Sequence, residues 1–592
     1  MPQSETIPHH RKALLFVENF WKRIDSNVIV LFPLPFLLLR LQGAWIYNYY
    51  AIDPWYYLGY FLRYEQYLKT FGNADYYSTR LAWLLPGHLL YSVLPPLIAR
   101  HVLHLGFYYA ALIGLYFTLK QLVGKRGALT ASVMLGCSLH FLFAVGTDYT
   151  DGAGITYCIL VLYFLTTAAI AKQWHVAVVL AGVFYGCSLH TNVAWLMAAL
   201  PLLLYYLLLN RSHQRHPVLI SIGLMTAGVL AITICLGGIN VMAGGKFFFF
   251  LPSVGTAVAL SSAPSGMRIP WSQWWFRADW LLLASVVCSG NLLLLIGQRL
   301  RWWSLQVSAM VVAVSLLLFA GIMAVLELTI VPVLQLLYYA NYITPFVYLA
   351  IGHQAASVVE RLKPYQFAIV AAFGSTILLV QSVTLSVDLQ ALLYSGIYLT
   401  SLVLFIFSRS SPLRVGLSLG VACTALFTVM QAGSLNTLVV GLSQPHQLAQ
   451  QRLDNQGIQR AVFLTTTDVI SYLKDVDPEV KTWFWYNDQE SPAYSAIAQT
   501  SLWHNRLMSN TFPELKIAHF KESQSAAQKR FSSYLAQSNP FQLAVLSRQP
   551  DAVDLAIKAL DQIGYRAEKS SALEVKRKYI SFKATILKVF PK

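Results

Sequence analysis

Long apolar runs separated by short polar segments fill residues 1–440, whereas apolar and polar positions alternate over shorter distances in residues 441–592. A transmembrane helix needs about 20 predominantly apolar residues. This length predicts thirteen spans, near 27–45, 101–121, 128–145, 154–171, 175–190, 192–209, 217–238, 280–297, 304–325, 331–352, 365–385, 390–408 and 413–434. We therefore expect an α-helical polytopic membrane domain at 1–440 and a separate domain at 441–592.

One apolar segment, 81–98, does not fit a simple span. It contains Pro86, Pro95 and Pro96, and a proline inside a helix removes a hydrogen bond and clashes with the preceding turn. We assign this segment to a long first outer loop, about 46–100, that carries helices on the membrane surface. If the segment crossed the membrane, the parity of the span count would change.

The second domain has the pattern of alternating strands and helices. Strands are predicted at 461–465, 481–486, 515–520, 541–547 and 580–590, and helices at 467–475, 491–500, 523–537 and 550–563. This alternation is typical of a small α/β domain. The segment contains no glycine-rich phosphate loop and no nucleophile motif, so we expect a docking or lid module rather than a second active site.

Composition supports this division of the chain. Hydrophobic residues make up 56% of it and charged residues 12%, so most of the chain has lipid as its solvent. Residues 1–440 contain 24 Lys and Arg and 12 Asp and Glu, whereas residues 441–592 contain 19 and 14. The net charge of +17 comes largely from short basic clusters between apolar runs, so nucleic acid is not an expected partner.

The distribution of charge predicts the orientation in the membrane. Loops assigned to the cytoplasm contain 16 basic and 4 acidic residues, and the opposite side of residues 1–440 contains 8 of each. Because short basic loops stay in the cytoplasm, we expect a cytoplasmic N-terminus. Thirteen spans then place the C-terminal α/β domain outside the cytoplasm, in a multi-pass protein of the cell (inner) membrane.

Three acidic residues in the predicted outer loops are the first candidates for chemistry. Asp53 follows the first span, and Asp148 and Asp151 lie in the short loop before the fourth. One carboxylate can accept a proton from an acceptor hydroxyl, and Asp53 and Asp151 together can share a divalent ion such as Mg²⁺ or Mn²⁺. Both also suit helix capping, since Asp53 precedes Pro54 and Asp151 precedes Gly152. The two roles are compatible.

The remaining candidates are basic, polar and aromatic residues on the same predicted side. Basic residues can neutralise a lipid phosphate or serve as interface anchors, and tyrosines can bind sugars or belong to the aromatic belt. The substrate-binding candidates are Arg80 and His88 in the first outer loop, Asp148 in the second, Lys246 and Arg268 in the third, and Tyr339, Asn341 and Tyr342 in the outer part of the tenth span. Glu327, near the end of the ninth span, is a further buried-acid candidate.

These residues together resemble the polytopic C-type glycosyltransferases (the GT-C fold), such as protein O-mannosyltransferases, the lipid A aminoarabinose transferase and catalytic subunits of oligosaccharyltransferases. Asp53 in AIDPWYYLGYF is similar to the key acid after the first span of that group, and Asp151 in TDYTDGAG is similar to the acid before the fourth. The segment NYITPFVYLA resembles a later stretch. The resemblance implies sugar transfer from a polyprenyl-phosphate-linked donor on the outer membrane face.

The resulting hypothesis is a membrane glycosyltransferase that acts on an extracytoplasmic acceptor, which is a lipid, a polysaccharide or a protein. Asp53 would be the base, Asp151 would position the acceptor or a divalent metal ion, and Lys246, Arg268 and Arg80 would neutralise the phosphate. The alternatives are a polytopic transporter or lipid flippase without glycosyl transfer, and a non-catalytic scaffold. Transporters usually show internal repeats and broken helices at mid-membrane, and the sequence shows no repeat.

Overall fold

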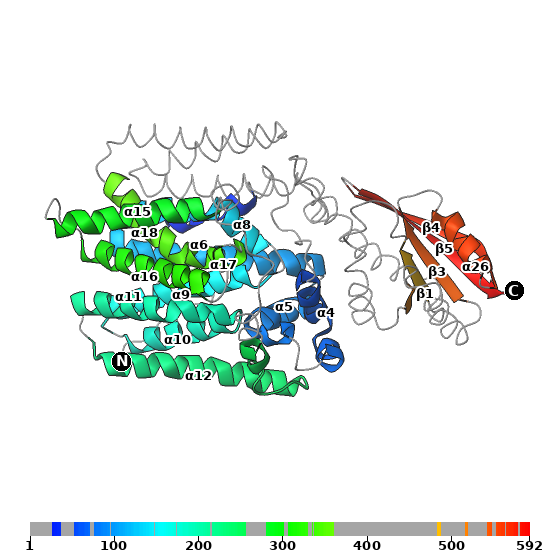
Figure 1. Cartoon of the computed structure of the whole chain (residues 1–592), viewed down its shortest axis with the longest axis horizontal. Coiled ribbons are helices and arrows are strands. Elements are labelled where there is room, and N and C mark those ends of the chain that lie inside the picture. Colours follow the sequence, from blue (N-terminus) through cyan, green and yellow to red (C-terminus); the bar gives the residue numbers. More distant parts are fainter. Residues whose placement is uncertain are drawn as a thin grey trace, which may run out of the picture.

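The structure is a computed structural model of the chain (Figure 1). It describes residues 26–36, 53–71, 76–94, 96–146, 149–172, 174–213, 216–255, 280–300, 306–329, 334, 337–359, 482–486, 516–518, 541–547, 552–562, 564–577 and 580–592.

The helical part contains short and long helices in chain order. They are α2 (Ser26–Ile29), α4 (Asp53–Phe71), η1 (Tyr77–Thr79), α5 (Leu81–Val93), α6 (Pro96–Val123), α7 (Lys125–Gly136), α8 (Leu139–Gly146), α9 (Asp151–Ile170), α10 (His175–Leu189), η2 (Val193–Ala198), α11 (Ala199–Ser212), α12 (Val218–Met242), α15 (Trp280–Arg299), α16 (Val307–Thr329), α17 (Leu337–Ala340), η4 (Asn341–Ile343) and α18 (Thr344–Val359). Within the described residues, five helices are long and apolar enough to cross a membrane, or six if one bent pair counts as a single span. The protein is therefore a multi-pass membrane protein.

The described helices agree with most of the spans predicted between 101 and 352. The predicted span 331–352 is, however, divided into α17, η4 and α18, and α18 continues to Val359. In the predicted span 27–45, helix α2 ends at Ile29. Further differences concern other segments. The predicted span 128–145 is broken into α7 and α8, which are bent by 64°. Helix α6 begins at Pro96 rather than at 101, and α5 continues through Pro86, so this proline does not interrupt the helix as expected. The predicted spans at 365–434 lie outside the described residues, and the total of thirteen remains a prediction.

Contacts between helices fix their relative directions. Thr156 of α9 donates to the Phe107 carbonyl of α6, and Gln121 of α6 donates to Thr167 of α9, so these two helices run parallel. Helices α10 and α12 are also parallel, since Gly182 contacts Met225 and Gly186 contacts Ile232. Successive passes therefore alternate in direction. The loops at 76–80, 149–151, 190–195, 240–250 and 339–343 meet at one end of the bundle, which we call the site end.

The parallel contact between α10 and α12 depends on glycine. A Cβ atom on Gly182 would lie 2.0 Å from the Met225 carbonyl oxygen, and one on Gly228 would lie 2.2 Å from the Val179 carbonyl oxygen. Both distances are far below van der Waals contact, so no larger residue fits. Small residues at helix interfaces are typical of membrane proteins, because they let two backbones approach closely.

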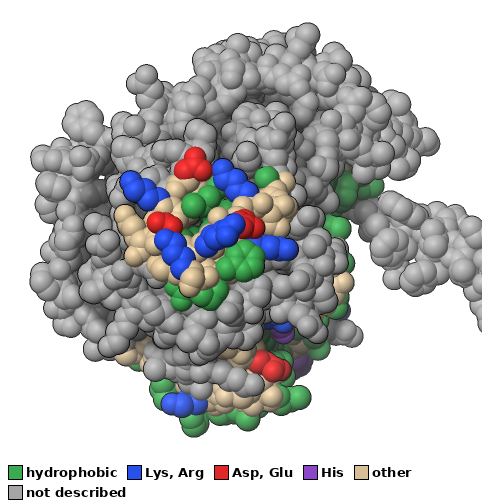
Figure 2. Space-filling view, turned by 90° about the vertical axis from the view of Figure 1, so that its right-hand side faces the viewer, with side chains coloured by type: hydrophobic (Ala, Val, Ile, Leu, Met, Phe, Trp, Pro, Cys, Tyr) green, Lys and Arg blue, Asp and Glu red, His purple; other side chains and the backbone are tan. Residues whose placement is uncertain are grey.

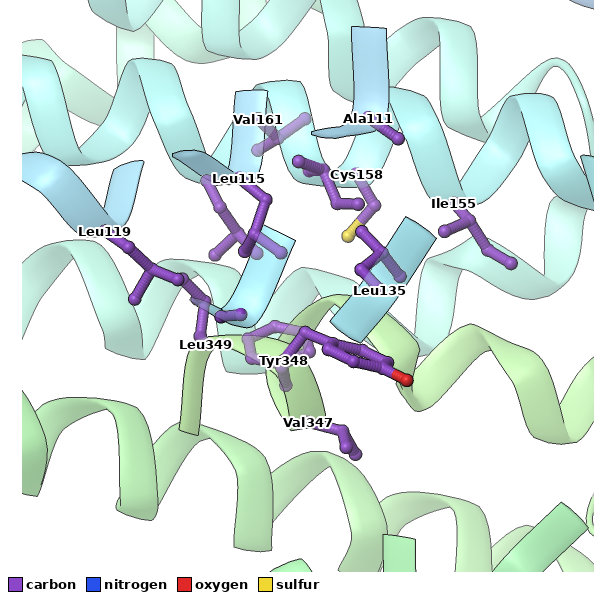
Figure 3. Close-up of a cluster of buried hydrophobic side chains, with 14 of the residues drawn as sticks. Ala111, Leu115, Leu119, Leu135, Ile155, Cys158, Val161, Val347, Tyr348 and Leu349 are labelled. Atoms are coloured by element: carbon purple, nitrogen blue, oxygen red, sulfur yellow. The ribbon is translucent and has the colours of Figure 1, made fainter. Parts of the chain in front are cut away.

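The core of the bundle is apolar and includes residues of α6, α7, α9, α10, α11, α16 and α18. Figure 3 shows Leu115 of α6, Leu135 of α7, Cys158 of α9 and Leu349 of α18 converging in one cluster, and each is at most 1% exposed. Such close packing holds the helix ends in fixed positions. The loops at the site end are therefore supported by a rigid frame.

The C-terminal part contains a five-stranded sheet in the order β2-β1-β3-β5-β4. Its elements are β1 (Thr482–Tyr486), β2 (Lys516–Ala518), β3 (Phe541–Ser547), α26 (Ala552–Gln562), β4 (Tyr565–Arg577) and β5 (Ile580–Pro591). Strands β1, β2 and β3 are parallel, and β5 pairs antiparallel with β3 and β4. Four predicted strands and the last predicted helix are found at their expected positions. The predicted strand 461–465, the other three predicted helices and the boundary at 440 lie outside the described residues.

Strand β4 was not predicted from the sequence. It lies at an edge of the sheet and carries alternating charges, which is how proteins protect edge strands from unwanted pairing. Figure 2 shows basic and acidic side chains mixed on the described face of this part. Exposed ion pairs in the described residues of this part include Arg566–Glu568 at 2.7 Å and Lys569–Asp554 at 3.1 Å.

Candidate active site

Two helices begin with an acidic residue at the site end. Asp53 is the first residue of α4, and Asp151 is the first residue of α9. The ring of Tyr57, one turn after Asp53, packs edge-on against Tyr149 with a centroid distance of 5.8 Å. The starts of α4 and α9 are therefore neighbours. Negative charge is favoured at a helix N-terminus, and Asp151 lies in the first turn of α9, although the N-cap of that helix is Thr150 rather than Asp151.

Asp151 has a partner distant in sequence. It is 3% exposed, and its Oδ1 accepts a hydrogen bond from the Tyr342 hydroxyl at 3.0 Å. The Tyr342 ring is fully buried and stacks on Trp195 with a centroid distance of 4.3 Å. Thr150, which precedes Asp151, makes no capping bond through its side chain. The carboxylate of Asp151 is thus held by a tyrosine from η4.

Arg80 is a buried cation in the same place. It is 2% exposed, donates from Nη1 to the Thr191 carbonyl oxygen, and lies 4.2 Å from the centre of the Tyr76 ring. Arg80 and Asp151 both interact electrostatically with the Tyr342 hydroxyl. A buried guanidinium is costly unless its donors are satisfied, yet Arg80 Nε has no partner among the described residues.

Other buried polar atoms around this cluster also lack hydrogen-bond partners. In the described part of the chain, hydrogen-bond partners are missing for the buried Thr150 Oγ1, Asn192 Nδ2 and Trp195 Nε1. Most buried polar groups in proteins are paired. A concentration of buried donors without partners beside a carboxylate is the arrangement expected of a site that binds an oxygen-rich ligand.

The turn between α10 and η2 holds Arg80 through the Thr191 carbonyl oxygen, and the turn itself is fixed by hydrogen bonds. His190 hydrogen-bonds through Nε2 to Thr233 of α12 at 2.8 Å, and the Thr191 hydroxyl donates to the Ser188 carbonyl at 2.7 Å. Asn192 caps η2, since its Oδ1 accepts from the Ala194 N–H at 3.1 Å. The sequence analysis did not select the residues of this turn. The available signal was a run of three polar residues between two apolar helices.

A second polar group surrounds the end of α12. Tyr64 of α4 donates to Asn240 Oδ1 at 2.8 Å, and Asn240 Nδ2 donates to the Lys246 carbonyl at 2.8 Å. His88 Nδ1 donates to the Phe61 carbonyl at 2.9 Å, and the His88 ring lies 5.4 Å from the Tyr64 ring. The Lys246 side chain is exposed. Thr79, next to Arg80, hydrogen-bonds to Ser253, which links this group to the Arg80 cluster.

The predicted candidates around η4 have different environments. Tyr339 is half-buried and its ring lies 5.8 Å from that of Tyr342. Asn341 is buried and donates to the His140 carbonyl at 3.4 Å. Glu327 is buried, and its Oε2 accepts from the Leu334 N–H at 2.6 Å. Asn341 and Glu327 thus hold backbone segments in place.

The structure therefore sorts the predicted site residues into groups. Asp151, Arg80, Tyr339 and Tyr342 share one cluster, whereas His88 and Lys246 belong to the group at the end of α12. Asp148, Arg268 and the side chain of Asp53 lie outside the described residues. Among the residues that the structure describes, no group of three His, Cys, Asp or Glu side chains could hold a metal ion.

Comparison with known proteins gives one family match. Residues 102–237 match the model of the family "Dolichyl-phosphate-mannose-protein mannosyltransferase". The matched segment runs from α6 to α12 and contains Asp151, Thr191 and Asn192. A comparison with curated proteins gives no match. The family match confirms the resemblance to polytopic glycosyltransferases for this segment and agrees with the expectation that the chain is such an enzyme.

Several solved structures are similar to the chain. ArnT from Cupriavidus metallidurans bound to undecaprenyl phosphate is 14% identical, with 98% of each chain covered and a TM-score of 0.37. The same protein in the apo state is 15% identical, with 97% of each chain covered and a TM-score of 0.37. The apo oligosaccharyltransferase of Archaeoglobus fulgidus is 12% identical, with 89% of this chain and 70% of that chain covered and a TM-score of 0.40.

Proposed function

We propose that the protein transfers a sugar from a polyprenyl-phosphate-linked donor to an acceptor outside the cytoplasm. The observation that carries this proposal is the buried Arg80 beside the Asp151–Tyr342 pair, with an Nε donor that lacks a partner in the described residues. A guanidinium suits phosphate because its planar fork can donate two hydrogen bonds to phosphate oxygens. The family match over residues 102–237 supports the same class of reaction.

The reaction is a single displacement at the anomeric carbon. The acceptor hydroxyl oxygen forms a bond to that carbon while the bond from the carbon to the phosphate oxygen breaks. Asp53 accepts the hydroxyl proton, and the polyprenyl phosphate leaves with the bonding electron pair. One base on the attacking side is sufficient for this inverting course.

Arg80 stabilises the charge that develops on the leaving phosphate. Donors that are positioned before the reaction stabilise such charge most effectively, because they need not reorganise. Thr191 holds Arg80 through its carbonyl oxygen, and Tyr76 covers the guanidinium. Lys246 and Arg268 would supply further positive charge. The exposed Lys246 side chain suits the headgroup region, where the lipid-linked phosphate lies.

Asp151 positions the acceptor. Its Oδ1 accepts from the Tyr342 hydroxyl, which fixes the carboxylate where it would orient a substrate hydroxyl or a divalent ion. Mg²⁺ is commonly held by one or two carboxylates together with substrate phosphates, so Asp151 and Asp53 fit this role. A bound ion would neutralise phosphate charge. A requirement for a divalent ion is tested by adding a chelator. Sugar transfer should be lost in the chelator and should recover when Mg²⁺ or Mn²⁺ is added.

A genetic experiment tests the proposed function. Envelope glycans and glycolipids of a deletion strain are compared by mass spectrometry after complementation with wild type or with Asp53→Asn. Wild type should restore a sugar modification that Asp53→Asn does not restore, although both proteins reach the membrane at equal levels. Restoration by Asp53→Asn would contradict the role of this base.

A further inference from the structure

Asn192 is a buried polar residue that the reaction described above does not use. It is 2% exposed, and its orientation is fixed because Oδ1 accepts from the Ala194 N–H at 3.1 Å. The amide nitrogen Nδ2 therefore forms the other end, and it has no hydrogen-bond partner in the described residues. Leaving a buried donor unsatisfied costs more than a single hydrogen bond gains. A ligand oxygen would remove that cost.

The residues around Asn192 indicate which part of a ligand would supply this oxygen. The preceding residue, Thr191, accepts the hydrogen bond from Arg80, and Trp195 stacks on Tyr342. Asn192 is the N-cap of η2, and its carbonyl accepts from the Trp195 N–H at 3.0 Å, so Asn192 lies one turn before Trp195. Asn192 thus lies between Thr191, which holds Arg80, and Trp195, which stacks on Tyr342.

The chemistry of the two side chains differs. Arg80 is charged and suits the phosphate, whereas the neutral amide of Asn192 suits a neutral oxygen. In a sugar phosphate the ring is attached directly to the phosphate, so a phosphate bound by Arg80 brings the ring hydroxyls near Asn192. We infer that Asn192 is a specificity-determining residue that donates through Nδ2 to a ring hydroxyl of the sugar donor. This inference rests on the proposed function.

A suitable variant removes the amide and keeps the helix cap. Serine is as good an N-cap as asparagine, so Asn192→Ser retains an acceptor for the Ala194 N–H but has no group that reaches the ligand. A neutral hydrogen bond contributes little enough that kcat/KM should fall about 3- to 10-fold. Asn210→Ser is the matched control, because Asn210 is equally buried and lies at the opposite end of η2 and α11.

The experiment measures how each protein discriminates among sugar donors. The probes are a synthetic isoprenyl-phosphate hexose that wild type accepts and its monodeoxy analogues. A site built to bind a hydroxyl rejects the analogue that lacks it. Wild type and Asn210→Ser should both penalise one analogue strongly, and Asn192→Ser should lose that penalty while keeping the penalties for the other analogues.

Three outcomes decide the matter. Loss of one penalty in Asn192→Ser, with unchanged inhibition by unsubstituted isoprenyl phosphate, supports the inference. Unchanged discrimination overturns it. Weaker inhibition by isoprenyl phosphate alone would place the contact on the phosphate and also overturns it. If wild type transfers no sugar from any such donor, the proposed function fails instead, so the two failures are distinguishable.

Discussion

Asn192 and Asn210 show how the two ends of the bundle differ. Both are 2% exposed, and in each the side-chain oxygen accepts a backbone N–H. Asn210 Nδ2 also donates to the His216 carbonyl at 2.9 Å, whereas Asn192 Nδ2 has no partner in the described residues. Asn210 thus completes its own hydrogen bonds, whereas Asn192 leaves a donor for a ligand.

The basic residues differ between the two ends in a similar way. Arg80 is buried at the site end, while Lys125, Arg126, Lys172 and Arg211 are exposed at the opposite end. Exposed basic residues cost little and mark orientation, and their grouping at one end agrees with the charge count. A buried cation needs a compensating partner. A basic residue at the exposed end therefore affects orientation in the membrane, whereas the buried Arg80 requires a partner of opposite charge.

The largest effect is expected from replacing the buried arginine. Arg80→Gln removes the charge beside the phosphate, and transfer should fall about 100-fold or more, as for other positioned groups that stabilise developing charge. Arg211→Gln, at the exposed end, should retain its rate within about twofold. Initial rates of sugar transfer by the purified proteins measure both. A rate near that of wild type for Arg80→Gln would remove Arg80 from the site.

The Asp151–Tyr342 pair should show strong coupling. Tyr342→Phe and Asp151→Asn each disturb a hydrogen bond to a charged group, so kcat/KM should fall about 10- to 100-fold in each. The double variant should be scarcely worse than the more damaged single variant. Tyr206→Phe, whose hydroxyl lies 2.9 Å from Ser221 Oγ at the other end, is the control. Additive losses would indicate two independent roles.

Gly154 tests the packing beneath the site. A Cβ atom there would lie 2.2 Å from Trp195 Nε1, whereas one on Gly106 would meet nothing within 4 Å. Gly154→Ala should destabilise the protein by about 1–3 kcal/mol through overpacking and reduce transfer by displacing Trp195. Gly106→Ala should do neither. Thermal unfolding in detergent and the transfer assay measure both effects, and equal behaviour of the two variants would contradict this packing.

The smallest effect is expected at the exposed cation. Lys246→Ala should raise KM for the lipid-linked donor a few-fold, with an unchanged kcat. The difference from wild type should shrink at high salt, because salt screens exposed charges. Michaelis curves at low and high ionic strength test this. A fall in kcat that persists at high salt would place Lys246 in the reaction itself.

Hydrophobic patterning predicted most of the described helices because a membrane span needs a long apolar run. It did not predict the break between α7 and α8 or the helical continuation through Pro86, since these depend on tertiary packing. The charged strand β4 was missed for a related reason. An edge strand needs no apolar face on both sides, so its pattern resembles that of a loop.

The site was predicted in part. Asp151, Arg80 and Tyr342 were selected because charged or aromatic residues at the rim of a membrane are unusual or carry the family resemblance. Their meeting could not be predicted, because Asp151 and Tyr342 are 191 positions apart in sequence. Asn192 and Trp195 were missed, since a buried donor without a partner is recognisable only in three dimensions.

The central claim is tested most directly by following both products of one reaction. Purified protein in vesicles is given a labelled polyprenyl-phosphate hexose and an acceptor, and the sugar transferred and the free polyprenyl phosphate released are quantified together. Wild type should release one polyprenyl phosphate for each sugar transferred, and Asp53→Asn should release none. Movement of the intact lipid-linked sugar between leaflets, without release of polyprenyl phosphate, would contradict the account and support a flippase.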